Sequence, residues 1–416
     1  MQNDDILTLL AKINPNSISD GKVKFMVDGK QYYSDIHDGE AKLSISNLYS
    51  GTYTVNASYG GNNYYSPCIS NNIPLIVSNI NINAPDVTKY YGGSERLVIE
   101  LKDKDRPISN AVINIYINNV DYTRTTNDEG IASMGINFNS GVYNSTISYN
   151  GTKTQTVVTV KDTVISKDVT KIFRNNTQYY ATFTDSKGNL LKNTEITFNI
   201  NGIFYTKTTN GDGMARLNIN LIPNTYILTA YNPSSGEKHT NIITVLLNIV
   251  ENHDLTKYYK NESKFSFRLL DNQGRPVGAG VSATLNINGV FYTRSTNASG
   301  YVNMNINLPP GTYIATILYN GLSMSNTIKI LPILKAKDIS MKYLDGTKFE
   351  ATLLDGKGNP FAGQDITFNI NGVFYKKTTD SNGIARLSIR LIAGEYIISS
   401  MYENGATISN KVTIVA

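Results

Sequence analysis

Short stretches in which apolar and polar residues alternate recur along the chain and predict β-strands. In residues 196–200, Ile and Phe side chains alternate with Thr and Asn, the period-two pattern of a strand with one buried face. The dipeptide Asn201-Gly202 follows and predicts a tight hairpin, because a type I′ turn needs positive φ at both central positions. About seven such strands, bounded by turn signals, fall between residues 170 and 245, which is typical of an immunoglobulin-like β-sandwich.

This pattern is repeated, and the repeats set the expected architecture. An Asp-x-Thr/Ser motif opens four units. A hairpin block, Asn-Ile-Asn-Gly-x-Phe-Tyr, recurs in three of them and is degraded in the first of the four. A Gly-x-Tyr block follows, as in Gly311-Thr-Tyr313, and predicts a tyrosine corner, in which the hydroxyl bonds to nearby backbone. The opening motifs begin at Asp86, Asp168, Asp254 and Asp338, and the hairpin blocks span 199–205, 286–292 and 369–375.

We therefore predict an all-β chain of five tandem immunoglobulin-like β-sandwich domains. The first unit has the same hairpin and Gly-x-Tyr order but a different beginning, so it is treated as divergent. Linkers between the units are short and not rich in Gly or Ser, which predicts an elongated rod. The expected domains are 1–82, 83–160, 161–246, 247–331 and 332–416.

Composition narrows the function classes. The net charge of +5 is modest, and Lys and Arg are scattered singly, so a nucleic-acid partner is not expected. The only cysteine, Cys68, excludes an intramolecular disulfide. No stretch approaches the ~20 apolar residues of a membrane helix, and Met1 to Leu10 lacks the basic-then-apolar order of a signal peptide. If the protein acts outside a cell, its export signal and its anchor are expected on segments not in this sequence.

Two motifs resemble those of known surface proteins. The opening Asp254-Leu-Thr-Lys-Tyr-Tyr259, together with the block from Asn286 to Arg294, resembles the repeats of adhesin-like surface proteins of methanogenic archaea, which are similar to bacterial Ig-like domains of the invasin type. The first unit resembles another bacterial Ig-like group through Gly-x-Val-x-Phe-x-Val-Asp-Gly at 21–29. The resemblance covers nearly the whole chain and implies a cell-surface, extracellular location and a role in adhesion or as a stalk. It brings no set of binding residues.

No catalytic or metal site is predicted. The three histidines, His37, His239 and His253, lie at non-equivalent positions in their units, so they suggest no Ser-His-Asp arrangement, and we expect no enzyme activity and no cofactor. Turns such as Asn210-Gly-Asp-Gly213 are similar to calcium loops but lack the bidentate Glu. Asx residues before Gly are what a tight turn needs for its own backbone.

A covalent cross-link is one hypothesis that the repeats suggest. Some surface Ig-like modules join a Lys of the first strand to an Asn of the last strand, with the help of a buried acid. Lysines occur early in three units and Asn residues open their last strands, but no acidic residue recurs nearby. The alternative is that these lysines are solvated. The candidate pairs are Lys171 with Asn241, Lys257 with Asn326, and Lys342 with Asn410.

Outward aromatic side chains are the best candidates for ligand binding. Exposed rings can stack on sugars or fill a partner's pocket. The alternative is that they stabilise the fold through cross-strand pairs or pack at domain junctions. One set falls on the outer face of the predicted hairpins, and the other ends the strand that follows the corner tyrosine. The candidates are Phe204, Phe291 and Phe374, and Tyr231, Tyr319 and Tyr402.

These features together predict an adhesin-like, non-catalytic repeat region that takes part in adhesion or projects a binding surface. The expected partner is another cell's surface protein or glycan, or a cell-wall polymer. Two alternatives stay open from the sequence alone. One is a carbohydrate-binding appendage of a larger wall-acting enzyme, and the other is a passive spacer.

Overall fold

The computed structural model describes residues 6–403 and 405–416, and within these ranges every regular element is a β-strand. Met1 to Asp5, part of the segment tested above for a signal peptide, lie outside the described residues. Contacts group the chain into two compact units, which are residues 1–167 with 180–217 and 228–240, and residues 168–179 with 218–227 and 241–416. The sandwiches are described one at a time.

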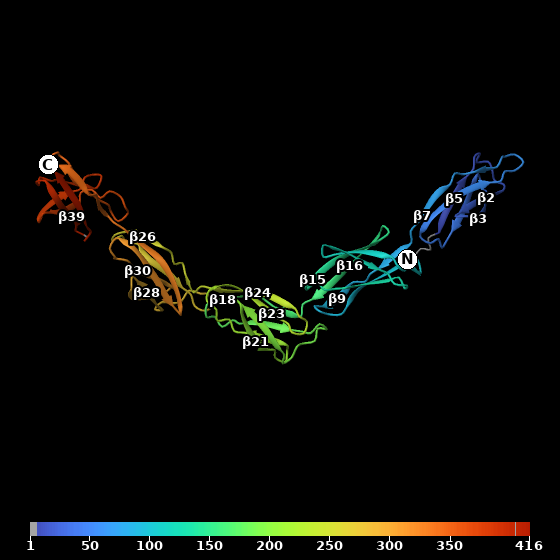
Figure 1. Cartoon of the computed structure of the whole chain (residues 1–416), viewed down its shortest axis with the longest axis horizontal. Coiled ribbons are helices and arrows are strands. Elements are labelled where there is room, and N and C mark those ends of the chain that lie inside the picture. The colour runs from blue at the N-terminus through green and yellow to red at the C-terminus, as the bar shows by residue number, and fades with distance from the viewer. Residues whose placement is uncertain (1–5, 404) are drawn as a thin grey trace. The chain divides into compact units, whose positions relative to one another are not determined.

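The second sandwich shows the plan (Figure 1). One sheet has the order β11-β10-β14 with β8 also paired to β10, and the other has the order β13-β12-β15-β16-β9. The opening segment changes sheets, because β8 pairs antiparallel with β10 whereas β9 pairs parallel with β16. Its strands are β8 (Ile80–Asn83), β9 (Val87–Tyr90), β10 (Arg96–Asp103), β11 (Arg106–Pro107), β12 (Val112–Ile117), β13 (Val120–Thr125), β14 (Ile131–Gly135), β15 (Gly141–Tyr149) and β16 (Thr152–Lys161).

Alternation places one side chain in two in the core between these sheets. Along β12, exposed and buried residues alternate without interruption, as a strand with one buried face requires. The inward residues of β10, namely Leu97, Ile99 and Leu101, are completely buried. Ile82 of β8 is buried over the same core, so the opening strand closes the sandwich along one side.

The third sandwich repeats this arrangement, with sheet orders β17-β19-β22 and β18-β24-β23-β20-β21. At its hairpin, Asn201 and Gly202 have φ of 53° and 79°, which confirms the predicted turn. Its strands are β17 (Val164–Ser166), β18 (Val169–Ile172), β19 (Tyr179–Phe183), β20 (Glu195–Ile200), β21 (Ile203–Thr208), β22 (Met214–Leu217), β23 (Asn224–Tyr231) and β24 (Lys238–Leu246).

The fourth sandwich has sheet orders β25-β27-β30 and β26-β32-β31-β28-β29. Its core is a single cluster built from the inward residues of both sheets. Its strands are β25 (Ile249–Val250), β26 (Leu255–Tyr258), β27 (Lys264–Leu269), β28 (Ser282–Ile287), β29 (Val290–Ser295), β30 (Tyr301–Asn305), β31 (Gly311–Tyr319) and β32 (Leu322–Leu331).

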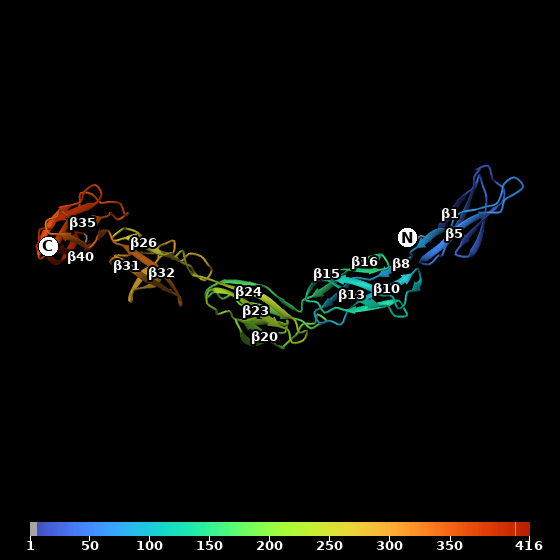
Figure 2. The ribbon, with the colours of Figure 1, turned by 45° about the horizontal axis from the view of Figure 1, so that its top comes forward.

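The fifth sandwich follows the same plan, with sheet orders β33-β35-β38 and β34-β40-β39-β36-β37. Figure 2 labels β35 and β40, which belong to its two different sheets. Its strands are β33 (Leu334–Ala336), β34 (Ile339–Lys342), β35 (Lys348–Leu353), β36 (Asp365–Ile370), β37 (Val373–Thr378), β38 (Ile384–Ser388), β39 (Gly394–Tyr402) and β40 (Thr407–Val415).

The first sandwich differs in one respect. One sheet holds only β1 and β4, and the other has the order β3-β2-β5-β6 with β7 also paired to β5. Strand β1 pairs with β4 as β10 pairs with β14 in the second sandwich, so β1 is the equivalent of β10. No described strand takes the places of β8 and β9. The strands are β1 (Leu7–Lys12), β2 (Lys22–Val27), β3 (Lys30–Asp35), β4 (Glu40–Ile45), β5 (Gly51–Tyr59), β6 (Cys68–Ile69) and β7 (Ile73–Val77).

Two details differ from the sequence-based expectation. Strand β8 begins at Ile80 and pairs within the second sandwich, so this sandwich starts before the expected boundary at residue 83. Each of the last four sandwiches also has a short first strand (β8, β17, β25, β33) in the sheet opposite its second strand. The sequence does not predict such strands, because two to four residues are too few to show an alternation of apolar and polar side chains.

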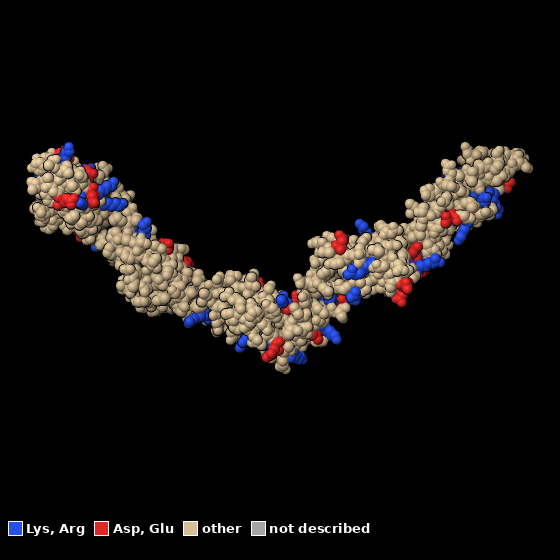
Figure 3. Space-filling view, in the orientation of Figure 1, with Lys and Arg blue, Asp and Glu red and all other residues tan. Residues whose placement is uncertain are grey.

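The described surface fits the scattered charge pattern. In the face drawn in Figure 3, Lys, Arg, Asp and Glu are dispersed among a majority of other residues. The structure describes no helix that is long and apolar enough to cross a membrane.

Candidate functional site

The aromatic residues predicted at the outer face of the hairpins lie there in three sandwiches. Phe204, Phe291 and Phe374 are 64%, 62% and 63% exposed. They occupy β21, β29 and β37, each of which is an edge strand of a five-stranded sheet. Each ring is set by register, because Phe204 pairs with Asn199, Phe291 with Asn286 and Phe374 with Asn369.

An exposed β-branched residue precedes each of these rings. Ile203, Val290 and Val373 are the first residues of their strands, directly after the Asn-Gly turn. Each pairs with a buried Ile of the neighbouring strand, and its place at the sheet edge leaves it open to solvent. The same edge strands carry Lys or Arg further along, which discourages edge-to-edge pairing of sheets. The aromatic edge, meaning these three Ile/Val-Phe pairs, is therefore an exposed apolar feature with one copy in each of three sandwiches.

The second sandwich lacks the aromatic edge. There the hairpin pairs Tyr116 with Asp121, so an acidic side chain stands where the other sandwiches have phenylalanine. The ring of Tyr116 lies on the neighbouring strand and is also exposed.

The tyrosines predicted to accompany the phenylalanines divide between the two faces. Tyr231 pairs with Thr197 on the outer face, and its ring centroid lies 6.1 Å from that of Phe204. Tyr402 instead is buried, donates to Gln364 Oε1 at 2.8 Å and packs on Phe361. Tyr319 also packs against its core, and burial raises the pKa of its hydroxyl.

The placement predicted for Tyr319 and Tyr402 is therefore wrong, and strand periodicity explains why. Tyr231 is the fifth residue after the corner tyrosine Tyr226, whereas Tyr319 is the sixth residue after Tyr313. Successive side chains of a strand point to opposite faces, so one extra residue turns the ring from the outer face to the core. The corner tyrosines themselves behave as predicted, since each hydroxyl donates to the carbonyl four residues earlier.

Two of the three lysines considered for cross-linking, Lys171 and Lys257, are buried and not solvated. Lys171 Nζ donates to the carbonyl oxygens of Thr177 and Ile219, each at 2.8 Å. Lys257 Nζ donates to the carbonyl oxygens of Asn261, Ser263 and Ile306. Burial lowers the pKa of both ammonium groups. These contacts satisfy main-chain oxygens at one end of the sandwich, which is a structural role.

Two further residues complete this lysine series. Lys89 of the second sandwich is equally buried and donates to the carbonyl oxygens of Gly93 and Ile136. In the fifth sandwich the equivalent residue is Met341, since Lys342 is one position later on β34 and exposed. The choice of Lys342 from the sequence is therefore wrong, because it follows residue identity and not position in the strand.

The asparagines of the last strands are held by other groups. Asn241 Oδ1 accepts from Tyr179 Oη at 2.7 Å, and its Nδ2 donates to Asp168 at 3.1 Å. Asn326 Oδ1 accepts from Asn252 at 2.8 Å, and Asn410 Nδ2 donates to Asp338 at 3.0 Å.

The Asp that opens each repeat has a clear structural role. Its Oδ1 accepts a main-chain N–H from the last strand in all four repeats, at 2.7 to 2.9 Å. The repeated Asp thereby ties the beginning of a sandwich to its end. The donors are Val157, Ile242, Thr327 and Lys411.

In the turns that are similar to calcium loops, the Asn or Asp side chain accepts hydrogen bonds from N–H groups of the turn itself. Asn210 Oδ1 accepts from the N–H groups of Asp212 and Met214, both at 2.9 Å. Asp380 Oδ1 accepts in the same way from Asn382 and Ile384. These are the Asx turns that the sequence predicted.

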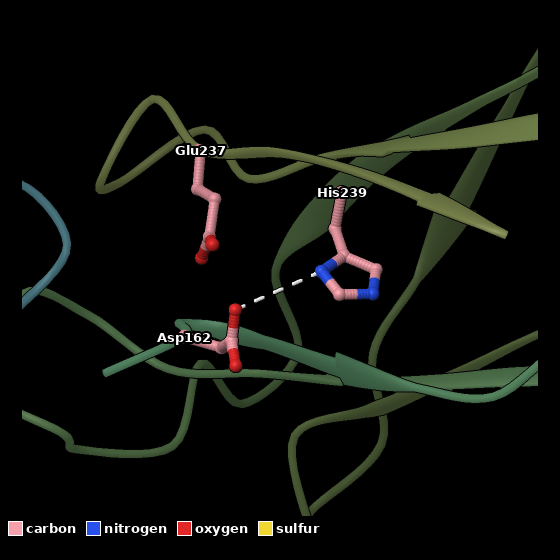
Figure 4. Close-up of side chains that lie close together, drawn as sticks. All are labelled: Asp162, Glu237 and His239. Atoms are coloured by element: carbon pink, nitrogen blue, oxygen red, sulfur yellow. Dashed lines mark ion pairs between the residues drawn. The ribbon is translucent and has the colours of Figure 1, made fainter. Parts of the chain in front are cut away.

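One cluster of potential metal ligands was not foreseen. Asp162, Glu237 and His239 point toward one another, and His239 Nδ1 lies 3.8 Å from Asp162 Oδ1 (Figure 4). Both oxygens of the buried Glu237 are already used, because Oε1 accepts from Ser140 Oγ at 2.6 Å and Oε2 from Thr163 Oγ1 at 2.6 Å. The cluster is thus a hydrogen-bonding centre that holds the chain around Thr163. Sequence offered no signal for it, since its members come from separate segments.

Comparison with known proteins adds little to this description. No family model matches the chain, and no curated protein sequence matches it. Among solved structures it is similar to the Ca²⁺-stabilised adhesin with which an Antarctic bacterium binds ice, at 14% identity and a TM-score of 0.18, over 81% of this chain and 99% of that one. Immunoglobulin domains 1–5 of Sidekick-1 match at 10% identity and a TM-score of 0.18, over 98% of this chain and 95% of that chain.

The tandem of domains I9–I11 of titin matches at 12% identity and a TM-score of 0.23, over 61% of this chain and 99% of that chain. Likenesses at this level carry no functional argument. The strand order of the chain itself identifies the fold class. The chain is an all-β protein made of tandem immunoglobulin-like β-sandwiches.

Proposed function

We propose that this chain is a non-catalytic, adhesin-like repeat region that binds an external surface through the aromatic edge. The observation that carries the proposal is the recurrence of one exposed Phe at one register position in three sandwiches. A fold requirement alone gives no reason for three rings of this size to remain about two-thirds exposed. We take the resemblance to adhesin-like repeats of methanogenic archaea as additional support for a cell-surface location.

Repetition is the physical basis of the proposed mechanism. A single exposed Phe on the outer face offers a small apolar contact, which gives weak binding by itself. Three such contacts on one chain raise the apparent affinity, because the second and third contacts form at a high effective concentration. A flat aromatic surface suits the apolar face of a sugar ring or a shallow pocket of a surface protein. The proposed partners are therefore a glycan, a wall polymer or a protein on another cell.

The test is binding of the full chain to intact cells, wall polymers and a glycan panel. The Phe204→Ala, Phe291→Ala and Phe374→Ala substitutions are made singly and together. The matched control is Thr206→Ala, Thr293→Ala and Lys376→Ala, which changes the residue two positions later on the same face of the same strands.

We expect each single Phe substitution to weaken binding several-fold, the triple variant to abolish it and the control to retain it. Binding that the triple variant retains would reject the aromatic edge as the contact surface. Absence of binding by the unmodified chain would favour the passive spacer. Binding confined to wall polysaccharide would favour the carbohydrate-binding appendage of a larger enzyme.

A further inference from the structure

A row of side chains crosses the outer face of the fifth sandwich and begins at the aromatic edge. Phe374 of β37 pairs with Asn369 of β36, Asn369 pairs with Ser399 of β39, and Ser399 pairs with Ser409 of β40. Residues directly opposite each other on antiparallel strands point to the same face, so the four side chains form one line across four strands. The hydroxyl oxygens of Ser399 and Ser409 lie 2.9 Å apart and are hydrogen-bonded.

The fourth and third sandwiches have the same arrangement, which we call the polar row: an Asn and then hydroxyl residues, in line with the Phe of the aromatic edge. In the fourth, the Phe is followed by Asn286, Thr316 and Ser325, and the two hydroxyl oxygens again lie 2.9 Å apart. In the third, it is followed by Asn199 and Thr229. The Asn and the first hydroxyl residue of each row lie between two buried residues of their strands, so their positions are fixed by the core.

The residues of the polar row are uncharged in all three sandwiches. In the fifth, Lys376 stands one row away on the same face, but its Nζ is paired with Asp365 Oδ2 at 2.8 Å. The second sandwich differs, because Asp121 and Tyr116 stand where the others have Phe and Asn. An ionised group placed on the polar row would lose water without gaining a partner of opposite charge, so the row favours an uncharged ligand.

A polysaccharide chain has the chemistry and the spacing that this arrangement requires. Each sugar presents a C–H face that stacks on an aromatic ring, and hydroxyl groups that bond to amide and hydroxyl side chains. Neighbouring strands lie about 4.8 Å apart, close to the length of one sugar in an extended chain, so the four positions match a run of about four sugars. A peptide fits less well, because the backbone groups of the sheet are already paired and its own N–H and C=O groups would meet few partners.

We propose that the ligand of the aromatic edge is an uncharged polysaccharide, which lies along the polar row and crosses the strands of the outer sheet. The Phe stacks on one sugar, and the Asn and the hydroxyl residues bond to the hydroxyl groups of the sugars that follow. This inference rests on the proposed function, because it takes the exposed phenylalanines as part of the contact surface. It narrows the partner to one chemical class and assigns the ligand a path across the sheet.

The test measures binding of the full chain to intact cells and to three neutral polysaccharides, cellulose, chitin and mannan, with alginate as an acidic counterpart. Calorimetry adds the oligosaccharides of the neutral polymers, from disaccharide to hexasaccharide. The row variant carries Asn199→Ala, Asn286→Ala and Asn369→Ala. The matched control changes the residue two positions earlier on the same face of the same strands, outside the polar row, and carries Thr197→Ala, Thr284→Ala and Thr367→Ala.

A second row variant separates binding from hairpin stability. Asn286 Oδ1 also accepts from the N–H of Gly289 at 2.9 Å, so the first variant removes a contact of the turn. The second variant therefore carries Ser325→Ala and Ser409→Ala, at the end of the polar row that lies away from the hairpin. Circular dichroism establishes that every variant is folded.

We expect the chain to bind cells and a neutral polysaccharide to compete with this binding, with an affinity that does not change with salt. Alginate should bind at least about tenfold more weakly. The Asn variant should lose at least about tenfold in affinity and the Ser variant about threefold, whereas the Thr control should stay within about twofold of the unmodified chain. Affinity for oligosaccharides should rise up to about the tetrasaccharide and level off beyond it, because the row then has no further position to fill.

Equal binding by the row variants and the Thr control would overturn the path along the polar row. Binding to cells that is lost in the triple Phe variant, together with no binding of any of the three neutral polysaccharides, would keep the proposed function and reject an uncharged polysaccharide as the ligand. Binding that the triple Phe variant retains would instead reject the proposed function, and this inference with it.

Discussion

The ammonium nitrogen of Lys171 lies 2.8 Å from the carbonyl oxygen of Ile219, deep in the end of the third sandwich. The same contact is made by Lys89 with Ile136 in the second sandwich and by Lys257 with Ile306 in the fourth. The fifth sandwich has Met341 at this position, so a long unbranched side chain without a charge is compatible with the fold.

This series predicts how substitutions at Lys171 differ. Lys171→Ala leaves two main-chain oxygens without their donor and also a cavity, so we expect it to lower the free energy of opening of this sandwich by about 2–4 kcal/mol. Lys171→Met retains the packing and should cost about half as much. Hydrogen exchange measured on peptide fragments gives the loss in free energy of opening for each sandwich separately. Lys207→Ala, on the exposed edge strand, is the control, and an equal effect of Met and Ala would contradict the packing argument.

The buried lysines also predict a pH dependence. Burial lowers the pKa of Lys89, Lys171 and Lys257, so the unfolded chain binds more protons than the folded chain between the lowered pKa and the ordinary value of 10.5. Stability contributed by these groups therefore rises as pH increases through that window.

The measurement compares the full chain with a variant carrying Met at all three positions, by urea unfolding followed with circular dichroism. From neutral pH toward pH 10.5, the unmodified chain should gain stability relative to the variant. If the stability of the unmodified chain relative to the variant stays constant over this range, the lysines keep an ordinary pKa in the folded state, and if it falls, their pKa is raised; either result would contradict the prediction.

Two glycines of the third sandwich allow the cost of a left-handed backbone conformation to be measured apart from the cost of steric crowding. Gly202 and Gly213 have φ of 79° and 68°, so an Ala at either site pays for a left-handed conformation. Nothing lies within 4 Å of a Cβ at Gly202, whereas a Cβ at Gly213 would lie 2.9 Å from the carbonyl oxygen of Phe183.

We expect Gly202→Ala to cost about 1 kcal/mol and Gly213→Ala at least about twice as much, measured by hydrogen exchange in this sandwich. The fourth sandwich, which contains neither substitution, is the internal control. Equal costs would mean that the turn around Gly213 relaxes around the added methyl group.

Intact mass spectrometry tests the cross-link hypothesis directly. Each Lys–Asn bond would remove one ammonia from the chain. We expect the mass of the unmodified sequence, because the lysines donate to main-chain oxygens and the fifth sandwich has Met341 at the equivalent position. A mass short by one or more ammonia molecules would revive the bonds at Lys171 or Lys257.

The sequence predicts those features that depend on local period and turn chemistry. The register that exposes Phe204 follows from Asn201-Gly202, because the turn fixes which residues face each other. The prediction that Tyr319 and Tyr402 lie on the outer face is wrong, because each is one residue further from its corner tyrosine than Tyr231 is. The parallel pairing of β9 with β16 could not be predicted from the sequence, since the pattern of a four-residue strand does not indicate which strand it pairs with. Similarly, the carbonyl oxygens around Lys171 come from segments far apart in the chain.

The parallel pairing of the second and last strands has a mechanical consequence. When the two ends of a sandwich such as the fifth are pulled apart, the load passes through β34 and β40, which lie side by side and run in the same direction. Because tension acts along both strands, the hydrogen bonds between them are sheared together, and no single bond can break first as in unzipping. We therefore expect a repeat of this kind to resist force better than one whose terminal strands unzip.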